Sequence, residues 1–172
     1  MSHPIIITAP QQIVLGKTPG IFLAGPIQQA PHWQQEACQI LASKSQHFIV
    51  MNPRQFEHKN KDFTAQQYHE QVNWRHEHIN HAISYGVMLF WLAQPVIRTA
   101  EHAYAQTTRF ELGEAMAKHI QIGNKVVVGL EEGFGDEEYI RQTLVQKSPN
   151  INIMNSLHET VAKAHELLWI SN

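Results

Sequence analysis

The chain has 172 residues, of which 43% are hydrophobic and 16% are charged, so it can bury the core of one domain and wholesale disorder is excluded. Thirteen Lys and Arg residues stand against fifteen Asp and Glu residues, so there is no basic excess for binding a nucleic-acid backbone. The single cysteine, Cys38, excludes an internal disulfide and a site built from several thiolates. No signal peptide is visible and no apolar run is long enough to span a membrane, so we expect a cytoplasmic protein without a membrane partner.

Short apolar runs alternate with longer amphipathic segments along the chain. The apolar runs predict strands at residues 21–24, 48–51, 86–92, 125–130 and 151–154. The amphipathic segments predict helices at residues 33–43, 64–82, 108–122, 136–145 and 156–169. Two of these helices open with a capping box, formed by Thr64 with Gln67 and by Ser156 with Glu159.

This alternation is typical of a parallel sheet with helices on both faces. We therefore expect one α/β domain over residues 1–172, built on a doubly wound five-stranded parallel sheet. Within it, residues 1–20 predict a small hairpin extension, with strands near residues 5–7 and 13–15. In open sheets of this kind, ligands bind at the carboxyl ends of the strands, where the strand order reverses.

Several residues at this edge suit a small polar ligand with a flat ring. They are Gly25, Pro26 and Ile27 after the first strand, Asn52 and Arg54 after the second, Trp91 in the third, and Thr108 and Glu111 in the helix that follows it. The first loop has one glycine, whereas dinucleotide-binding and phosphate-binding loops need several spaced glycines, so we expect no nicotinamide, ATP or other cofactor. The sequence also lacks a Gly-x-Ser-x-Gly elbow, which argues against a serine nucleophile.

Two interpretations of Glu111 are open. Thr108 and Glu111 have the spacing of a capping box, so Glu111 could simply close the start of its helix. A carboxylate in the first turn of a helix also feels the positive end of that helix, stays ionised and could act as a nucleophile. The two roles do not exclude each other.

Six short motifs follow one another between residues 21 and 134. They are Phe22-Leu23-Ala24-Gly25-Pro26-Ile27, Met51-Asn52-Pro53-Arg54, Gln71-Val72-Asn73-Trp74, Leu89-Phe90-Trp91, Phe110-Glu111-Leu112-Gly113 and Val126-Val127-Val128-Gly129. In this order they resemble the nucleoside 2-deoxyribosyltransferase-like family. The resemblance implies a flavodoxin-like sheet, a glutamate nucleophile that falls on Glu111, a small nucleoside or nucleotide substrate, and a homo-oligomer with shared active sites.

The chain departs from the pattern of this family in two places. Many relatives have an acidic residue directly after the helix tryptophan, where this chain has Arg75. The nearest acid is Glu77, about 200° further around the helix, and Glu101 is a second candidate for the acid partner of the reaction. Residues 82–85 look like a short insertion before the third strand.

The resemblance also suggests roles for the other residues at the edge. Asn52, Arg54 and the backbone of Gly25 would hold sugar or phosphate oxygens, while Trp74 or Trp91 would stack on the base. Alternatively, Arg54 pairs with a surface carboxylate, and both tryptophans are part of the core.

Four histidines cluster on the helix predicted at residues 64–82. They are His69, His76, His78 and His81. Because the sequence has no His-Glu-x-x-His motif, we expect no metal site. A solvated helix face or a pH-sensitive seam between subunits explains the cluster better.

By resemblance, we expect an enzyme that cleaves the N-glycosidic bond of a (deoxy)nucleoside or nucleotide and passes the sugar to another base. The first alternative is a hydrolase of the same chemistry, with water as acceptor. The second is a non-catalytic module that binds or senses nucleotides, and Arg75 in place of an acid favours it.

Overall fold

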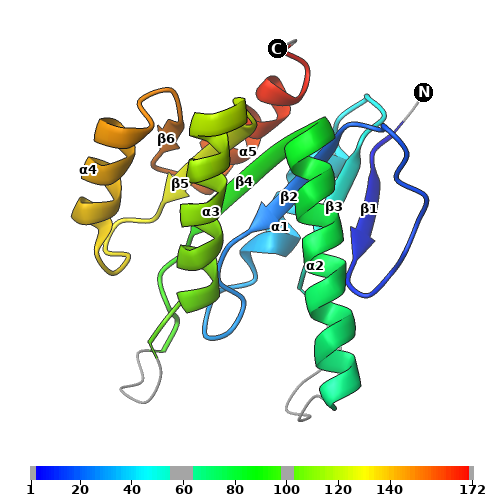
Figure 1. The fold of residues 1–172 in the computed structure, drawn as a ribbon, viewed down its shortest axis with the longest axis horizontal. Helices are drawn as coiled ribbons and strands as arrows, with labels where there is room; N and C mark the ends of the chain where they lie inside the picture. The colour runs from blue at the N-terminus through cyan, green and yellow to red at the C-terminus, as the bar shows by residue number, and fades with distance from the viewer. Residues whose placement is uncertain (1–2, 55–63, 98–102, 171–172) are drawn as a thin grey trace.

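The computed structural model describes residues 3–54, 64–97 and 103–170 and places a six-stranded parallel sheet between two layers of helices (Figure 1). The strands are β1 (Ile5–Thr8), β2 (Gly20–Ala24), β3 (Ile49–Asn52), β4 (Gly86–Leu92), β5 (Lys125–Leu130) and β6 (Asn152–Met154). The helices are α1 (Trp33–Ala42), α2 (Ala65–Tyr85), α3 (Gln106–Ile122), α4 (Glu137–Lys147) and α5 (Leu157–Leu168). Helices α2, α3 and α4 cover one face of the sheet, and α1 and α5 cover the other (Figure 1).

The strand order is β1-β3-β2-β4-β5-β6. From β2 the chain passes to β3 on one side, then crosses to β4 on the other side and continues outward through β5 and β6. Strands β2 to β6 therefore have the flavodoxin-like order, which confirms the expected fold class. The order reverses between β2 and β4, so the ends of these two strands define the ligand-binding edge of the fold.

The amino-terminal segment differs from the predicted hairpin, and the sheet has six strands where the sequence predicted five. Strand β1 lies parallel to β3, with Ile5 opposite Ile49 and Thr8 opposite Asn52, while residues 13–15 form no strand. The free edge of β3 offers β1 a row of unpaired backbone groups, and pairing there also buries Ile7 in the core. The apolar residues 13–15, which suggested a second hairpin strand, instead contribute Leu15 to the core.

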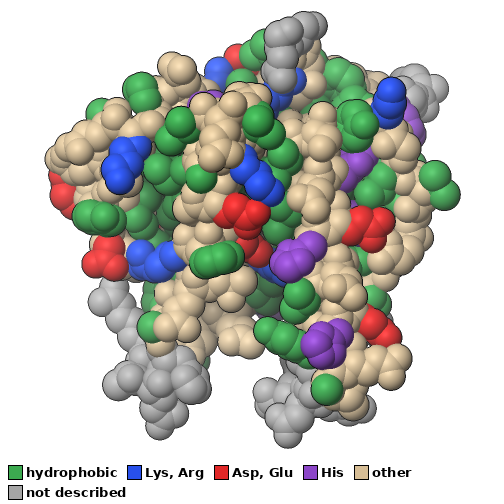
Figure 2. Space-filling model, in the orientation of Figure 1, with side chains coloured by type: hydrophobic (Ala, Val, Ile, Leu, Met, Phe, Trp, Pro, Cys, Tyr) green, Lys and Arg blue, Asp and Glu red, His purple; other side chains and the backbone are tan. Residues whose placement is uncertain are grey.

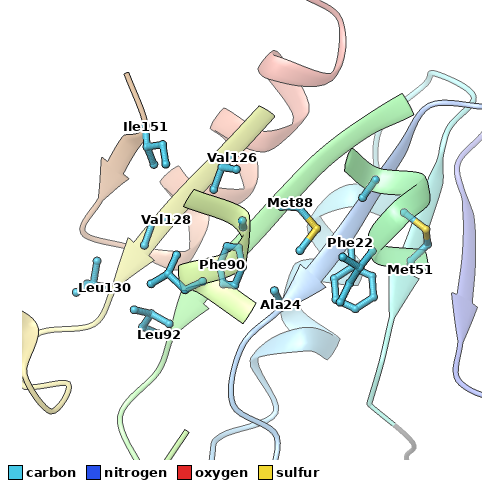
Figure 3. Close-up of a cluster of buried hydrophobic side chains, with 14 of the residues drawn as sticks. Phe22, Ala24, Met51, Met88, Phe90, Leu92, Val126, Val128, Leu130 and Ile151 are labelled. Carbon is cyan, nitrogen blue, oxygen red and sulfur yellow. The ribbon is translucent and has the colours of Figure 1, made fainter. Parts of the chain in front are cut away.

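Successive side chains along the strands point to opposite faces and build two separate cores. Phe22, Met88 and Phe90 pack beneath α2, α3 and α4 (Figure 3). Leu23 and Trp91 pack against α1 and α5 on the other side. The sheet therefore separates side chains that are neighbours in sequence.

Helix boundaries follow local signals in the sequence. The capping box at the start of α2 is confirmed, because Thr64 Oγ1 accepts a hydrogen bond from the amide of Gln67 at 3.2 Å, while Gln67 Oε1 accepts from the amide of Thr64 at 3.0 Å. The Ser156 hydroxyl caps α5 by accepting from the amide of Glu159 at 3.2 Å. Residues 82–85, the expected insertion, form the last turn of α2, which runs directly into β4.

None of the helices in the described ranges is both long enough and apolar enough to cross a membrane.

Candidate functional site

An ion pair between helices α2 and α3 is the main feature on their face of the sheet. Arg75 Nε donates to Glu111 Oε1 at 2.8 Å, and Arg75 Nη2 donates to Glu111 Oε2 at 2.7 Å. The side chains are 13% and 9% exposed, respectively, so the pair lies at the edge of the buried region rather than in free solvent. Both oxygens of the carboxylate are thus held by one guanidinium, the geometry in which such pairs are strongest.

Glu111 does not close the start of its helix. Helix α3 begins at Gln106, two residues earlier than predicted, and its N-cap, Ala105, makes no side-chain capping bond. Glu111 consequently lies in the second turn, one turn beyond the buried Thr108 on the same helix face. The capping-box interpretation of these two residues is therefore wrong, because Glu111 points to α2 and binds Arg75 instead.

Arg75 keeps hydrogen-bonding capacity beyond this ion pair. Its guanidinium carbon lies 5.8 Å from the centre of the Phe22 ring, within the range of a cation–π contact. Within the described part of the chain, its Nη1 group donates to no protein acceptor. Figure 2 shows acidic side chains over the middle of α3, histidines along α2, and a hollow in the surface below them.

Arg54 is buried and holds the loop that follows β2. Its Nη1 donates to the carbonyl of Pro31 at 2.7 Å and to Gln34 Oε1 at 2.8 Å, while its Nη2 donates to the carbonyls of Ile27 at 2.9 Å and Ala30 at 3.3 Å. Burial lowers the pKa of Arg54 from its ordinary value. The alternative of a surface ion pair does not fit these contacts, since the acceptors are neutral oxygens of one loop and the start of α1.

Asn52 lies on the α1 side of the sheet, away from Glu111. Its Oδ1 accepts from the amide of Arg54 at 2.9 Å, which fixes the turn after β3, and its buried Nδ2 has no partner in the described ranges. Beside it lies a cavity of about 210 Å³ between β1 and α1. The cavity is lined by Ile6, Thr8, Gln35, Cys38, Gln39, Ala42 and Asn52.

The loop after β2 is also bonded internally. A side chain at Gly25 would overlap the ring of Trp33 and the carbonyl oxygen of Trp91. The carbonyl of Pro26 accepts from Trp33 Nε1 at 3.0 Å and from Gln34 Nε2 at 3.2 Å. The backbone of Gly25, Pro26 and Ile27 is therefore arranged for packing, and the Pro26 and Ile27 carbonyls already have donors.

Both candidate stacking residues are buried. Trp74 is 1% exposed, donates from Nε1 to the carbonyl of Gln11 at 2.8 Å, and stacks on His78 with ring centres 3.9 Å apart. Trp91 is 6% exposed, faces α1 and α5, and packs so closely on Gly129 that a side chain there would overlap its ring. These contacts agree with the core interpretation of both tryptophans, and we leave them out of the site.

The two candidate acids do not join the ion pair in the described residues. Glu77 is exposed on α2 and makes no ion pair or hydrogen bond within the described ranges, and Glu101 lies outside them. The structure thus brings Arg75, Thr108 and Glu111 to one side of the sheet and leaves Asn52 and Trp91 on the other.

The histidine cluster divides into two pairs. His69 and His76 are exposed, but His78 and His81 are buried, so a solvated face describes only half of the cluster. The ring nitrogens of the buried pair lie 2.7 Å from the carbonyl of Trp74 and 2.8 Å from that of Thr18. Among the residues that the structure describes, no group of three or more His, Cys, Asp or Glu side chains could hold a metal ion.

The sequence of the central region decides the family. The sequence model of a family described as "Nucleoside 2-deoxyribosyltransferase like" matches residues 18–134, well over half of the chain. The chain belongs to the nucleoside 2-deoxyribosyltransferase-like family. The match confirms the resemblance, and it covers β2 to β5 together with Arg75 and Glu111. A search among curated proteins found no match.

Membership of the nucleoside 2-deoxyribosyltransferase-like family indicates a glycosyltransferase-like enzyme that acts on small-molecule nucleosides. Sequence reasoning marked both Arg75 and Glu111 but missed their pairing, since 36 positions separate them. The one signal in the sequence was the basic residue at position 75, where many relatives have an acid. A guanidinium at such a position either pairs with a carboxylate or is solvated.

Proposed function

We propose that this protein cleaves the N-glycosidic bond of a nucleoside or nucleotide, with Glu111 as the nucleophile, and passes the sugar to another base. The observation that supports this most directly is the buried carboxylate of Glu111 on α3, directed toward α2 beside the edge where the strand order reverses. A carboxylate in such a place can attack an electrophilic carbon without competition from bulk water. Family membership supplies the nucleoside as substrate class.

The reaction takes two displacements at C1′ of the sugar. First, an oxygen of Glu111 bonds to C1′ while the C1′–N bond breaks, and the electron pair of that bond leaves with the base, which takes up a proton from an acid partner or from solvent. Next, a nitrogen of a second base attacks C1′, releases the Glu111 carboxylate and gives up its proton to solvent. Two inversions at C1′ leave the configuration of the sugar unchanged.

Glu111→Gln tests the nucleophile. We expect base release to fall by at least about 10³-fold, because the amide cannot form the ester intermediate. The matched control is Glu114→Gln, which changes an exposed carboxylate of the same helix that pairs with Lys118 at 2.8 Å. The assay measures free base released from a panel of nucleosides and their monophosphates. Full turnover by Glu111→Gln, or an equal loss in both variants, would refute the assignment.

The acceptor separates the two catalytic alternatives. With a second free base present, a transferase forms a new nucleoside, whereas a hydrolase releases free sugar at the same rate with or without the base. The non-catalytic alternative has one observation in its favour, the occupation of both Glu111 oxygens by Arg75. It predicts nucleotide binding with no base release under any condition.

A homo-oligomer with shared sites is also part of the proposal. Helix α3 leaves Phe110, Ile120 and Ile122 between 61% and 76% exposed, and contact with a second subunit would bury such apolar side chains. Light scattering of the purified protein at micromolar concentration tests this, and a monomeric mass would contradict it.

A further inference from the structure

We propose that Arg75 makes the enzyme selective for phosphorylated nucleosides: a phosphate monoester on the sugar draws the Arg75 guanidinium away from one oxygen of Glu111. The inference rests on the proposed function, because it concerns how Glu111 becomes free to react. Arg75 would thus recognise an anionic group on the substrate. The acidic residue that many relatives have at this position cannot do so.

Both carboxylate oxygens of Glu111 are bound to Arg75. Oε1 and Oε2 each accept a short hydrogen bond, at 2.8 and 2.7 Å, from the same guanidinium. Such charge-assisted bonds draw electron density from both oxygens and so lower their nucleophilicity. Attack on C1′ is therefore favoured when at least one of the two bonds weakens.

A neutral sugar is a poor competitor for this guanidinium, but a phosphate is a good one. Hydroxyl groups offer no charge to replace the carboxylate, whereas phosphate oxygens bind arginine in the same bidentate manner as carboxylates do. The pair is still partly exposed, at 13% and 9%, so an incoming ligand can reach it. An anionic substituent is thus the kind of group that can exchange with Glu111 at Arg75.

The donors of Arg75 suit this exchange. The Nε–Nη2 edge holds Glu111, while Nη1 has no acceptor in the described part of the chain. A phosphate on the Nη1–Nη2 edge would accept from Nη1 and from the second N–H of Nη2, the one that does not face Oε2. Its charge would pull the guanidinium toward that edge and lengthen the Nη2–Oε2 bond, while the Nε bond to Oε1 keeps Glu111 oriented and Oε2 becomes available to C1′.

Arg54 and Arg109 are less suited to this role. The sequence suggested Arg54 as a phosphate partner. Its guanidinium already donates four hydrogen bonds to oxygens of the loop after β2 and the start of α1. Arg109 is bound to Asp136 at 3.4 Å and to the carbonyl of Gly135 at 2.8 Å. Among the described residues, Arg75 is the one of these three whose acceptors are both oxygens of the candidate nucleophile.

The test compares turnover of 2′-deoxynucleosides with that of their 5′- and 3′-monophosphates. For the wild type we expect kcat/KM to be about 10- to 100-fold higher for one of the two phosphate esters than for the nucleoside, the range of one or two charge-assisted hydrogen bonds. The better ester identifies the position of the phosphate. In Arg75→Gln we expect this ratio to fall to near one, while the control Arg109→Gln keeps the wild-type ratio. Equal rates for nucleoside and both esters in the wild type would overturn the inference.

Binding of inorganic phosphate gives a readout that does not depend on turnover. We expect phosphate to raise the Tm of the wild type and of Arg109→Gln but not that of Arg75→Gln. If Arg75→Gln does not fold, Arg75→Lys retains the charge, and a reduced but measurable ratio is then expected because an ammonium cannot bind both groups at once. Glu111-dependent turnover without phosphate preference would refute the role of Arg75 and leave the proposed function standing. Arg75-dependent phosphate binding without any base release would refute the proposed function and support the anion site.

Discussion

The roles of three arginines depend on the acceptors around them. Arg54 is 7% exposed and donates to neutral oxygens, so it acts as an internal brace: it fixes the loop after β2 in place. Arg109 is more exposed and pairs with Asp136, a contact of low expected energy. Within the described residues, Arg75 pairs with one acid, Glu111, and its Nη1 has no acceptor, which makes it suited to bind a second anion.

Removing the Arg54 brace should destabilise the protein. Arg54→Ala deletes four hydrogen bonds and leaves partly buried carbonyls of the loop after β2 without donors, so we expect a loss of about 2–4 kcal/mol in the free energy of unfolding. Arg54→Lys should recover little, because an ammonium cannot reproduce the planar fork. Urea denaturation measures both effects. Arg109→Ala is the control, expected within about 0.5 kcal/mol of the wild type; equal midpoints for Arg54→Ala and Arg109→Ala would contradict the interpretation.

At the scale of elements, the junction of α2 and β4 fixes where Arg75 meets Glu111. Helix α2 ends at Tyr85 and β4 starts at Gly86 with no loop between them. This direct junction depends on the contact of Gly86 with Gly20, its partner on β2, where a side chain would overlap the Gly20 backbone. The two facing glycines therefore allow β2 and β4 to approach closely where α2 joins the sheet.

Two glycine substitutions should act in opposite directions. Gly86→Ala forces backbone atoms of β2 and β4 apart, so we expect it to lower the free energy of unfolding by at least about 2 kcal/mol. Gly113→Ala adds a methyl group on the open side of α3, where nothing lies within 4 Å, and should stabilise the protein by about 0.5–1 kcal/mol through helix propensity. Thermal and urea unfolding of the pair test this, and a similar loss in both variants would show that the close approach of β2 and β4 is not the cause.

At the scale of the whole molecule, the sheet determines which side chains can act together. Asn52 and Trp91 face α1 and α5, whereas Trp74 and Glu111 lie on the side of α2 and α3. The residues at the carboxyl ends of the strands thus lie at one edge of the sheet, but their side chains point to opposite faces. Only some of the predicted site residues can therefore contact the same ligand.

The same packing buries a titratable group beneath α2. His78 is fully buried against Trp74, with Nε2 unpartnered among the described residues. Burial lowers the pKa of His78 below 6.5, and nearby His81 acts in the same direction, while the carbonyl of Trp74 and the charge of Glu77 oppose the shift. The folded protein therefore holds this histidine in its neutral form at a pH where the unfolded chain binds a proton.

Stability should fall on acidification below about pH 6.5, because the unfolded state then takes up a proton at His78 that the folded state does not. Above that pH both states are neutral at this site and it contributes no slope. In His78→Leu we expect a smaller loss of Tm between pH 7 and pH 5, although His165, whose pKa burial also lowers, keeps part of the slope. His69→Leu, on the exposed part of α2, should keep the wild-type profile. An unchanged slope in His78→Leu would show that other groups cause the acid sensitivity.

The sequence by itself determined the elements and the class of the fold. Apolar runs and helix caps are local signals, so β5 was predicted over the same residues as observed and the Thr64 cap was correct. The ordered motifs around Glu111 also identified the family. The partner of β1 was missed because a short edge strand carries no sign of which neighbour it pairs with, and pairing with β3 depends on an edge that exists only after folding.

Only the tertiary structure decided how the site is assembled. The sequence placed Arg75 and Glu111 on separate helices, and their two hydrogen bonds form because α2 and α3 lie side by side on one face of the sheet. Likewise, the strand residues Asn52 and Trp91 were expected near Glu111 because the carboxyl ends of parallel strands meet at one edge. The alternation of side chains along each strand then sent these two to the other face, since the direction of a side chain at a strand end depends on register, and register is set by the assembled sheet.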